Sequence, residues 1–549
     1  LPICFYIELR VREGDEPNAY SYVIAREDGR LLFRNNLTSH DAAPHAFTYS
    51  VWADPVTGAP YPGPQGLDLN PYPQAQANGY AMRLAPASQL TLANAPFSRN
   101  DPWVDEAANS RVQFSYGNNA RVFADLQSPK GYSGSPVSMA VACGARADVT
   151  QVDFFACSTS YSFVYGYDFA ASATKNREQI SSSVANLFYV VNWLHDWFYD
   201  AGFDEAAGNA QASNFERGGL EGDPITAQVL QFARVNNASM ETPADGDSPV
   251  LRTFAYNAGT PTRSAALDNT IVAHEWAHYL SNRLIGNANG LTSRQSAGLG
   301  EGWGDFLALL VTVTEQDRLK PGNEQYQGAY AQAAYAKAGR AYPASDPSNA
   351  AYFGSRRYPY STDMAKNPLT FKHMQDGEPL PEGVPRNPGL SALTDPLLTA
   401  NSQLHNTGEV WASMLWECYA GMLNTRPFPE AQQRMRNYLV AGMKLTPVLP
   451  TLLEARDALL AAVAASDSQD YASCLGGFAK RGAGLDAIGP GRLSMTNQGV
   501  AESYNAGPLL AIESMALSMA DEQSRRCDAD TGLDHTATGT LFLQLINRG

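Results

Sequence analysis

The pattern of apolar and polar side chains divides the chain into a strand-like N-terminal part and a helix-rich C-terminal part. Apolar and polar residues alternate over about the first 40 positions, around an Asp28-Gly29 pair, and this predicts a β-hairpin. Apolar residues spaced three and four positions apart instead predict four helices, over about 181–200, 402–424, 428–445 and 450–466. His195 falls within the first of these helices and is interpreted as a buried, hydrogen-bonded core residue.

Two kinds of sequence lie between the hairpin and the first helix. Residues 55–79 are dense in proline and glycine, which prevents regular elements and predicts an extended linker. Short runs rich in β-branched and aromatic residues follow between about 80 and 165, among them RVQFSYG, ARVFADL and VDFFACS. We therefore predict an α+β fold, with a β-rich N-terminal lobe and a mostly α-helical C-terminal lobe.

Size and charge narrow the classes of function. A chain of 549 residues is too long for one hydrophobic core, so about two to four domains are expected. The formal net charge of -16 argues against nucleic acid or an anionic membrane surface as a partner. No run approaches the roughly 18 apolar residues of a membrane span, so we expect none.

The six cysteines are scattered and form no CxxC pair, which excludes zinc knuckles. Disulfides formed in an oxidising compartment fit this spacing better. We predict the pairs Cys143–Cys157 and Cys474–Cys527. Cys418 lies inside an apolar helical pattern, where a buried thiol is equally compatible with the sequence.

The chemistry of the chain concentrates between Ile271 and Phe306. His274 and His278 stand four residues apart, so in a helix they share one face and can bind one metal ion. Glu275 follows the first histidine and can take a proton from a metal-bound water. The HExxH spacing therefore predicts a catalytic zinc site.

A catalytic zinc site needs a third protein ligand and leaves one position open. Glu301 is the candidate, because it lies downstream on a second predicted helix. Asp305, one turn later, can accept the free ring N–H of a ligating histidine. The alternatives are two core histidines without a metal, or a closed structural site, which would need a further ligand such as a nearby cysteine.

The segments HEWAHYLSNRL and QSAGLGEGWGDF resemble the fungalysin family of secreted zinc metalloendopeptidases, part of the thermolysin-like group. Four further segments resemble the family in the same order: FYVVNWLHDWFYDAGFDEAAGNAQASNFERGG, NNASMETPADGDSP, YSTDMAKNPLTF and HNTGEVWASMLWE. The likeness runs from about residue 101 to about residue 484. Tyr279, Leu299 and Gly304 depart from residues common in the family.

This resemblance implies roles for three residues beyond the metal site. Asn237 and Ala238 match an edge-strand pair that binds the substrate backbone, although an asparagine turn is the alternative. His405 matches a histidine that stabilises the oxyanion of the tetrahedral intermediate. The zinc helix is expected at the cleft between the two lobes.

The pattern and the resemblance together predict five segments. They are 1–50, the C-terminal remnant of a propeptide; 51–180, a linker and the β-rich lobe; 181–270, a helix and the substrate-binding edge strand; 271–520, the helical catalytic domain; and 521–549, the start of a truncated C-terminal β-sandwich module.

Calcium is a further candidate cofactor, at either of two acidic turns. One turn holds Asp245 and Asp247, and the other holds Asp528, Asp530 and Asp534.

The motif predicts a zinc hydrolase, and the family resemblance implies a secreted, extracellular endopeptidase that cuts proteins before an apolar residue, with its own propeptide as an inhibitor. Glu275 serves as the general base. A zinc aminopeptidase and a catalytically silent surface adhesion protein on a protease fold are the alternatives. The first would need an acidic clamp for a free amine, and the second would be expected to have lost a ligand or Glu275.

Overall fold

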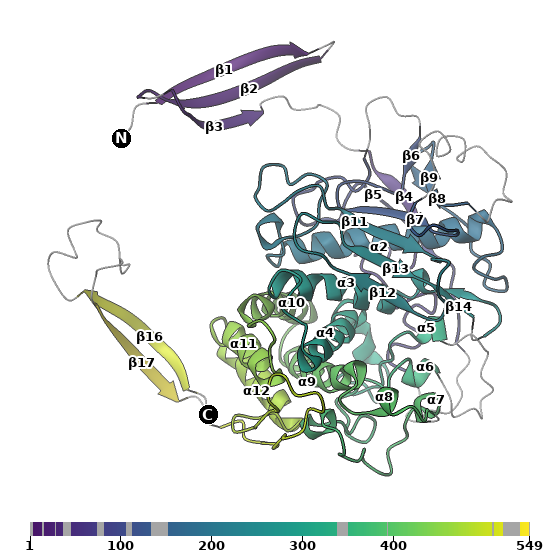
Figure 1. The fold of residues 1–549 in the computed structure, drawn as a ribbon, viewed down its shortest axis with the longest axis vertical. Helices are drawn as coiled ribbons and strands as arrows, with labels where there is room; N and C mark the ends of the chain where they lie inside the picture. The colour runs from purple at the N-terminus through teal and green to yellow at the C-terminus, as the bar shows by residue number, and fades with distance from the viewer. Residues whose placement is uncertain are drawn as a thin grey trace. The chain divides into compact units, whose positions relative to one another are not determined.

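The computed structural model of the chain describes most of its residues (Figure 1). The described ranges are 4–13, 16–27, 29–36, 45–73, 82–105, 112–132, 152–257, 259–337, 350–391, 393–507, 510–519 and 539–547. The chain separates into two compact units, residues 1–46 and 47–549.

The N-terminal unit contains a three-stranded antiparallel sheet in the order β1-β2-β3. Its strands are β1 (Cys4–Glu13), β2 (Glu16–Ala25) and β3 (Leu31–Asn36). The predicted hairpin corresponds to β2 and β3, and Gly29 has a φ of +70° in the turn between them. The residues with the alternating pattern therefore form strands as predicted, and β1 adds a third strand to the predicted hairpin.

A five-stranded sheet in the order β12-β13-β11-β7-β8 forms the main β layer of the second unit. Its strands are β7 (Ala120–Ala124), β8 (Phe154–Phe155), β11 (Ile225–Val229), β12 (Ala238–Glu241) and β13 (Val250–Thr253). The strand β12 lies at the edge of this sheet and pairs antiparallel with β13.

Smaller sheets complete the β-rich region. They consist of β4 (Phe47–Val51), β5 (Ser88–Leu92) and β10 (Ser162–Phe163); β6 (Gln113–Phe114) and β9 (Cys157–Ser158); and β14 (Ala255–Tyr256) and β15 (Arg263–Ser264).

Long helices form most of the C-terminal half of the chain, and one more, α2, precedes them in the first half. They are α2 (Arg177–Tyr199), α3 (Asn269–Leu284), α4 (Arg294–Thr312), α9 (Leu404–Thr425), α10 (Phe428–Leu445), α11 (Leu452–Ala464) and α12 (Ser468–Lys480). The first begins earlier than predicted because the Asn176 side chain caps it by accepting the Gln179 N–H. The four predicted helices are all present, and the fold is α+β.

Short helical turns connect these elements. They are η1 (Glu205–Ala207), η2 (Ala265–Leu267), η3 (Glu315–Leu319), α5 (Ala334–Lys337), α6 (Ala350–Phe353), η4 (Phe371–Met374), α7 (Pro388–Ser391) and α8 (Pro396–Thr399).

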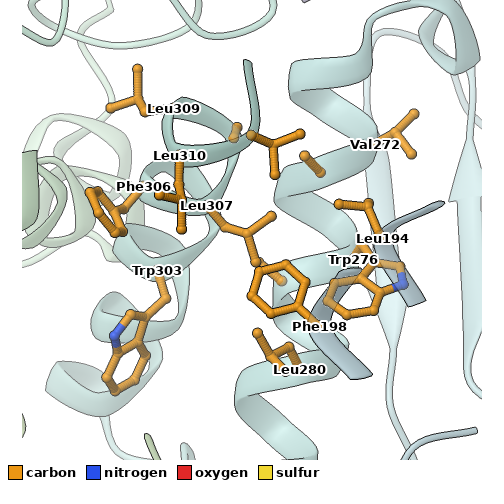
Figure 2. Close-up of a cluster of buried hydrophobic side chains, with 14 of the residues drawn as sticks. Leu194, Phe198, Val272, Trp276, Leu280, Trp303, Phe306, Leu307, Leu309 and Leu310 are labelled. Atoms are coloured by element: carbon orange, nitrogen blue, oxygen red, sulfur yellow. The ribbon is translucent and has the colours of Figure 1, made fainter. Parts of the chain in front are cut away.

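The hydrophobic core lies between the sheet and a succession of packed helices. Helix α2 packs against β4, β7 and β11 and also against α3, which packs on α4, which in turn packs on α9. Figure 2 shows the middle of this succession, where side chains of α2, α3 and α4 interdigitate. Phe198 of α2 stacks on Trp276 of α3 with ring centroids 5.1 Å apart. The zinc-helix candidate is thus fixed by apolar packing between α2 and α4.

Glycines set the spacing of the helices around α4. A Cβ atom at Gly302 would lie 2.6 Å from the Gly408 carbonyl oxygen of α9. A Cβ atom at Gly304 would lie 2.6 Å from the His274 Nδ1 of α3. Only residues without a side chain allow α4 to approach both neighbours this closely.

A disulfide joins Cys418 of α9 to Cys474 of α12. The predicted Cys474–Cys527 pair is therefore wrong, and Cys418 is not a buried thiol. The two helices pack so that both sulfurs lie in their interface, which cysteine spacing alone does not reveal. Cys157 is also disulfide-bonded, while Cys143 and Cys527 lie outside the described residues.

A separate antiparallel pair, β16 (Leu510–Met519) and β17 (Gly539–Asn547), follows the helical region. Strand β16 falls within the segment 271–520 that was predicted as the helical domain, so strand structure starts earlier than the predicted boundary at 521. Within the described part of the chain, no helix is long and apolar enough to cross a membrane.

Candidate active site

The zinc-ligand candidates converge on one point between α3 and α4. His274 and His278 of α3 bring their Nε2 atoms to 3.2 Å from each other. Glu301 of α4 places its Oε2 atom 3.3 Å from the first of these nitrogens and 3.8 Å from the second. Among the described residues this is the one group of three or more potential metal ligands that lie this close together.

The hydrogen bonds around these residues match a bound cation. His274 donates from Nδ1 to Asp305 Oδ1 at 2.7 Å, so its Nε2 presents a lone pair to the site. Glu301 Oε2 is buried and has no hydrogen-bond partner in the described structure. Electron-rich atoms that face each other in a buried site repel unless a cation lies between them. Two imidazoles and one carboxylate form a ligand set typical of catalytic zinc.

The pKa values of the three candidate ligands agree with a site that binds a cation. Burial alone would lower the pKa of His274, but the neighbouring Asp305 and Glu301 carboxylates outweigh burial and raise that pKa to about 10. Burial lowers the pKa of His278 to about 4, so this ring is neutral and able to ligate. Although burial opposes the effect, the neighbouring histidines hold the pKa of Glu301 well below its usual range. A metal ion can replace the proton on His274.

Glu275 lies beside the candidate metal ligands. It follows His274 on α3, lines the same cleft and is 8% exposed. Burial raises its pKa to about 7, opposed by the neighbouring His274. A carboxylate with a pKa near neutrality can both accept and return a proton under physiological conditions.

The sequence reasoning missed the residues that hold Asp305. Arg356 donates to both of its carboxylate oxygens, from Nε at 2.5 Å and from Nη2 at 2.7 Å, and the Tyr360 hydroxyl donates to Oδ2. Gln332 donates from Nε2 to its backbone oxygen at 2.7 Å. Despite burial, Arg356 and His274 hold the pKa of Asp305 well below its usual range, so the carboxylate stays ionised. Tyr360 opens a segment that resembles the family, but nothing in the sequence marked Arg356.

A cleft of about 290 Å³ opens above this site. Its lining combines the metal-site helices with residues of the sheet edge and of the segment before α9. Lining residues include Asn237, Ala238, Tyr256, Ile271, His274, Glu275, Arg356, Leu390, Leu393, Leu398 and His405.

Asn237 immediately precedes the edge strand β12, and Ala238 is the first residue of that strand. Asn236 precedes them with a φ of 57°, and its side chain hydrogen-bonds to Asn257 at 2.8 Å. This turn brings β12 alongside the cleft. An edge strand at a cleft can pair with an extended peptide.

His405 stands at the first turn of α9, on the wall of the same cleft. Its Nε2 lies 3.2 Å from Glu301 Oε2, and its side chain is 46% exposed. Partial burial lowers its pKa, and the Glu301 carboxylate opposes that shift. All predicted site residues are therefore gathered at one place.

Tyr279, Leu299 and Gly304, the departures from the family pattern, all lie inside the protein. The Tyr279 hydroxyl accepts the Ala210 N–H, and Leu299 is fully buried. Gly304 contacts His274, so it affects the spacing of the ligand helix and supplies no ligand atom.

In the first candidate calcium turn, Asp245 forms hydrogen bonds within the protein. Asp245 accepts a hydrogen bond from Arg283 at 3.1 Å and another from the Leu220 N–H at 3.1 Å. Its carboxylate is thus already partnered by a cationic side chain, and calcium binding there stays a prediction. The second acidic turn, Asp528 to Asp534, lies outside the described residues.

His195 is a core residue, as predicted. Its Nδ1 lies 3.0 Å from Asp196 Oδ1 and its Nε2 lies 3.1 Å from Gln211 Oε1.

Comparison with known proteins agrees with this geometry. The extracellular metalloproteinase mep of Aspergillus terreus is 34% identical over 344 residues, which cover 60% of this chain and 47% of that protein. The extracellular metalloproteinase mep of Aspergillus fumigatus is 33% identical over 347 residues, covering 60% and 48%. Extracellular metalloproteinase 1 of Arthroderma otae is 32% identical over 343 residues, covering 59% and 47%. The chain spans about half the length of these curated relatives.

The family model of the fungalysin metallopeptidases (M36) matches residues 82–487, slightly more than the range that the sequence motifs suggested. This match covers well over half of the chain and includes every candidate site residue. The chain belongs to the fungalysin metallopeptidase (M36) family.

Proposed function

We propose that this protein is a secreted zinc-dependent endopeptidase that hydrolyses internal peptide bonds of proteins. The observation that carries the proposal is the convergence of His274, His278 and Glu301 beside Glu275 in an open cleft. Membership of a metallopeptidase family supports the reaction class. Its relatives are named extracellular metalloproteinases, which supports secretion.

His274, His278 and Glu301 would hold the zinc ion, with Asp305 orienting the first of them. When bound, zinc would lower the pKa of a water molecule and polarise the scissile carbonyl. Glu275 accepts the proton of the attacking water and delivers it to the leaving amine. His405 donates a hydrogen bond to the developing oxyanion.

The rest of the cleft would hold the substrate. Asn237 and Ala238, on the edge strand, would hydrogen-bond to the main chain of an extended peptide. Apolar side chains of the cleft, among them Ile271 and Leu390, favour an apolar residue just after the cut. The preference can be measured with a peptide library that varies this residue alone.

We also propose that residues 1–50 act as an inhibiting propeptide. The separate compactness of residues 1–46 supports this view, because such a unit can be removed without disturbing the core that holds the site. Removal of residues 1–46, which leaves β4 (Phe47–Val51) and its pairing with β5 in place, should increase the hydrolysis rate.

The test of the proposed function is Glu275→Gln. This variant keeps the size of the side chain and removes the base, so hydrolysis of casein and of amino-blocked peptides should fall at least ~10³-fold at equal zinc content. Glu241→Gln, a change at the far end of β12, serves as the control.

Three other outcomes have different meanings. Activity restricted to peptides with a free amine would indicate an aminopeptidase. A zinc-loaded parent without activity, even after removal of residues 1–46, would favour the silent adhesion protein. Equal rates in the parent and Glu275→Gln would contradict the role of Glu275.

A further inference from the structure

Gln403 caps helix α9 and by doing so fixes its own amide orientation. Its Oε1 accepts the Asn406 backbone N–H at 3.1 Å. A backbone N–H can only donate, so the amide oxygen, and not the amide nitrogen, must face it. The orientation of this amide is therefore determined by the helix and not by the cleft.

The other end of the amide contacts His405. Gln403 Nε2 lies 2.9 Å from His405 Nδ1. An amide nitrogen can only donate here, so Nδ1 must accept and cannot carry a proton. A neutral imidazole protonated on one nitrogen then carries its proton on Nε2.

Nε2 is the nitrogen that faces the metal site. It lies 3.2 Å from Glu301 Oε2, and His405 lines the cleft over the zinc ligands. The contacts from the first turn of α9 through Gln403 to His405 thus direct the Nε2 nitrogen toward the metal site.

We propose that Gln403 is a positioning residue that fixes the ring of His405 with Nδ1 toward its amide and Nε2 toward the metal site, so that Nε2 is the nitrogen that donates a hydrogen bond to the oxyanion. This inference rests on the proposed function and specifies the form in which His405 acts. The proton stays on Nε2 throughout, and the ring acts only as a donor. A carboxylate at position 403 would instead accept a hydrogen bond from Nδ1, which requires the proton on that nitrogen and so favours the opposite tautomer.

The tautomer can be observed directly in the zinc-loaded protein. Histidine labelled with ¹⁵N gives separate signals for protonated and unprotonated ring nitrogens, and a His405→Phe variant assigns the signals of this ring. At mildly alkaline pH we expect an unprotonated Nδ1 and a protonated Nε2. In Gln403→Glu, which keeps the acceptor for the Asn406 N–H, Nδ1 should gain a proton. A protonated Nδ1 in the parent would overturn the proposal.

Kinetics separate positioning from simple helix capping. Gln403→Met removes both hydrogen bonds at similar volume, and we expect kcat to fall about tenfold with KM nearly unchanged, because the oxyanion forms only in the transition state. Thr451→Ala removes the comparable cap of α11, where Thr451 accepts the Glu454 N–H, and should lower thermal stability without lowering kcat.

The outcomes distinguish the positioning role of Gln403 from the proposed function of the protein. An unchanged kcat in Gln403→Met would overturn the positioning role, as would an equal loss of kcat in Thr451→Ala. An inactive parent would contradict the proposed function, and the ¹⁵N spectrum would still support or overturn the tautomer by itself.

Discussion

Asp305 connects the metal site to the surrounding protein. It is 1% exposed, and its carboxylate accepts hydrogen bonds from His274, Arg356 and Tyr360. A buried carboxylate without a partner would strongly destabilise the fold, so Asp305 depends on the cationic Arg356. His274 in turn depends on Asp305 for its orientation. The carboxylate keeps the proton of His274 on Nδ1 and thereby keeps Nε2 free to bind a metal.

Asp305→Asn should weaken zinc binding about 10- to 100-fold, because an amide no longer holds the His274 ring by a charge-assisted hydrogen bond. Competition with a chelator of known affinity measures the change. Asp363→Asn is the matched control, since this partly exposed residue pairs with Lys366 and is not a lining residue of the cleft. Equal zinc affinity in Asp305→Asn and the parent would contradict the orienting role.

Secondary-structure elements differ in how well the sequence defined them. Helices α9, α10 and α11 have long amphipathic patterns and were predicted within about two residues at each end. Helix α12 was not predicted, because Gly476 and Gly477 interrupt its pattern. Gly477 is needed there, since a Cβ atom would lie 2.8 Å from the Cys418 backbone nitrogen.

The candidate site also contains residues that local helical spacing predicts and one residue that it does not. His274, Glu275 and His278 follow from one helical spacing, and Glu301 and Asp305 follow on the next helix. Arg356 comes from an irregular segment 51 residues beyond Asp305, where no periodicity constrains its place. The sequence therefore predicted the three candidate ligands that the structure brings together, but not the residue that neutralises Asp305.

The edge strand β12 gives a prediction about substrates. If a peptide pairs with this strand, main-chain N–H groups of the substrate contribute to binding at alternate positions. Peptides N-methylated at one position at a time should lose about 3- to 10-fold in kcat/KM per hydrogen bond removed, alternating with position. A uniform response along the peptide would contradict strand pairing.

The turn η3 gives a prediction about pH. Asp317 is buried and accepts hydrogen bonds from the Thr314 N–H at 3.1 Å and from Asn70 Nδ2 at 3.2 Å. Burial raises its pKa to about 7, whereas an unfolded aspartate has a pKa of ~3.9. Between these values only the folded protein binds the proton, so the free energy of unfolding falls as pH rises, by up to ~1.4 kcal/mol per pH unit.

Asp317→Asn should remove this contribution. The stabilising effect is complete below the unfolded pKa and lost as pH rises through about 7. Denaturant titrations of the parent and the variant at several pH values between these limits measure the difference in slope. Parallel slopes would show that the folded-state pKa of Asp317 is not raised.

Two buried links connect α9, which carries His405, to the neighbouring helix α12. Helix α9 has His405 at its start and Cys418 in its middle, and the Cys418–Cys474 bond ties it to α12. Arg481, at the end of α12, forms a second tie through Glu417 at 2.8 Å. Both ties are buried, so they remain intact while the folded state persists.

Removing the disulfide with Cys418→Ala and Cys474→Ala together should lower stability by about 4 kcal/mol, because the bond closes a loop of 56 residues in the unfolded chain. Calorimetry or denaturant unfolding measures the loss. The folded parent should resist mild reductants, since both sulfurs are fully buried. A double variant as stable as the parent would show that packing alone holds the two helices.

The glycine contacts of α4 determine how mutational data on this gene should be interpreted. Gly302 and Gly408 exclude any side chain because the backbone of the other helix already occupies the space. In a saturation scan scored by hydrolysis, these positions would be as intolerant as Glu275. They would look like reacting groups, yet they contribute no atom to the chemistry. Zinc retention distinguishes the two kinds of loss, because a Glu275 variant keeps its metal while a displaced α4 carries Glu301 away from its partners.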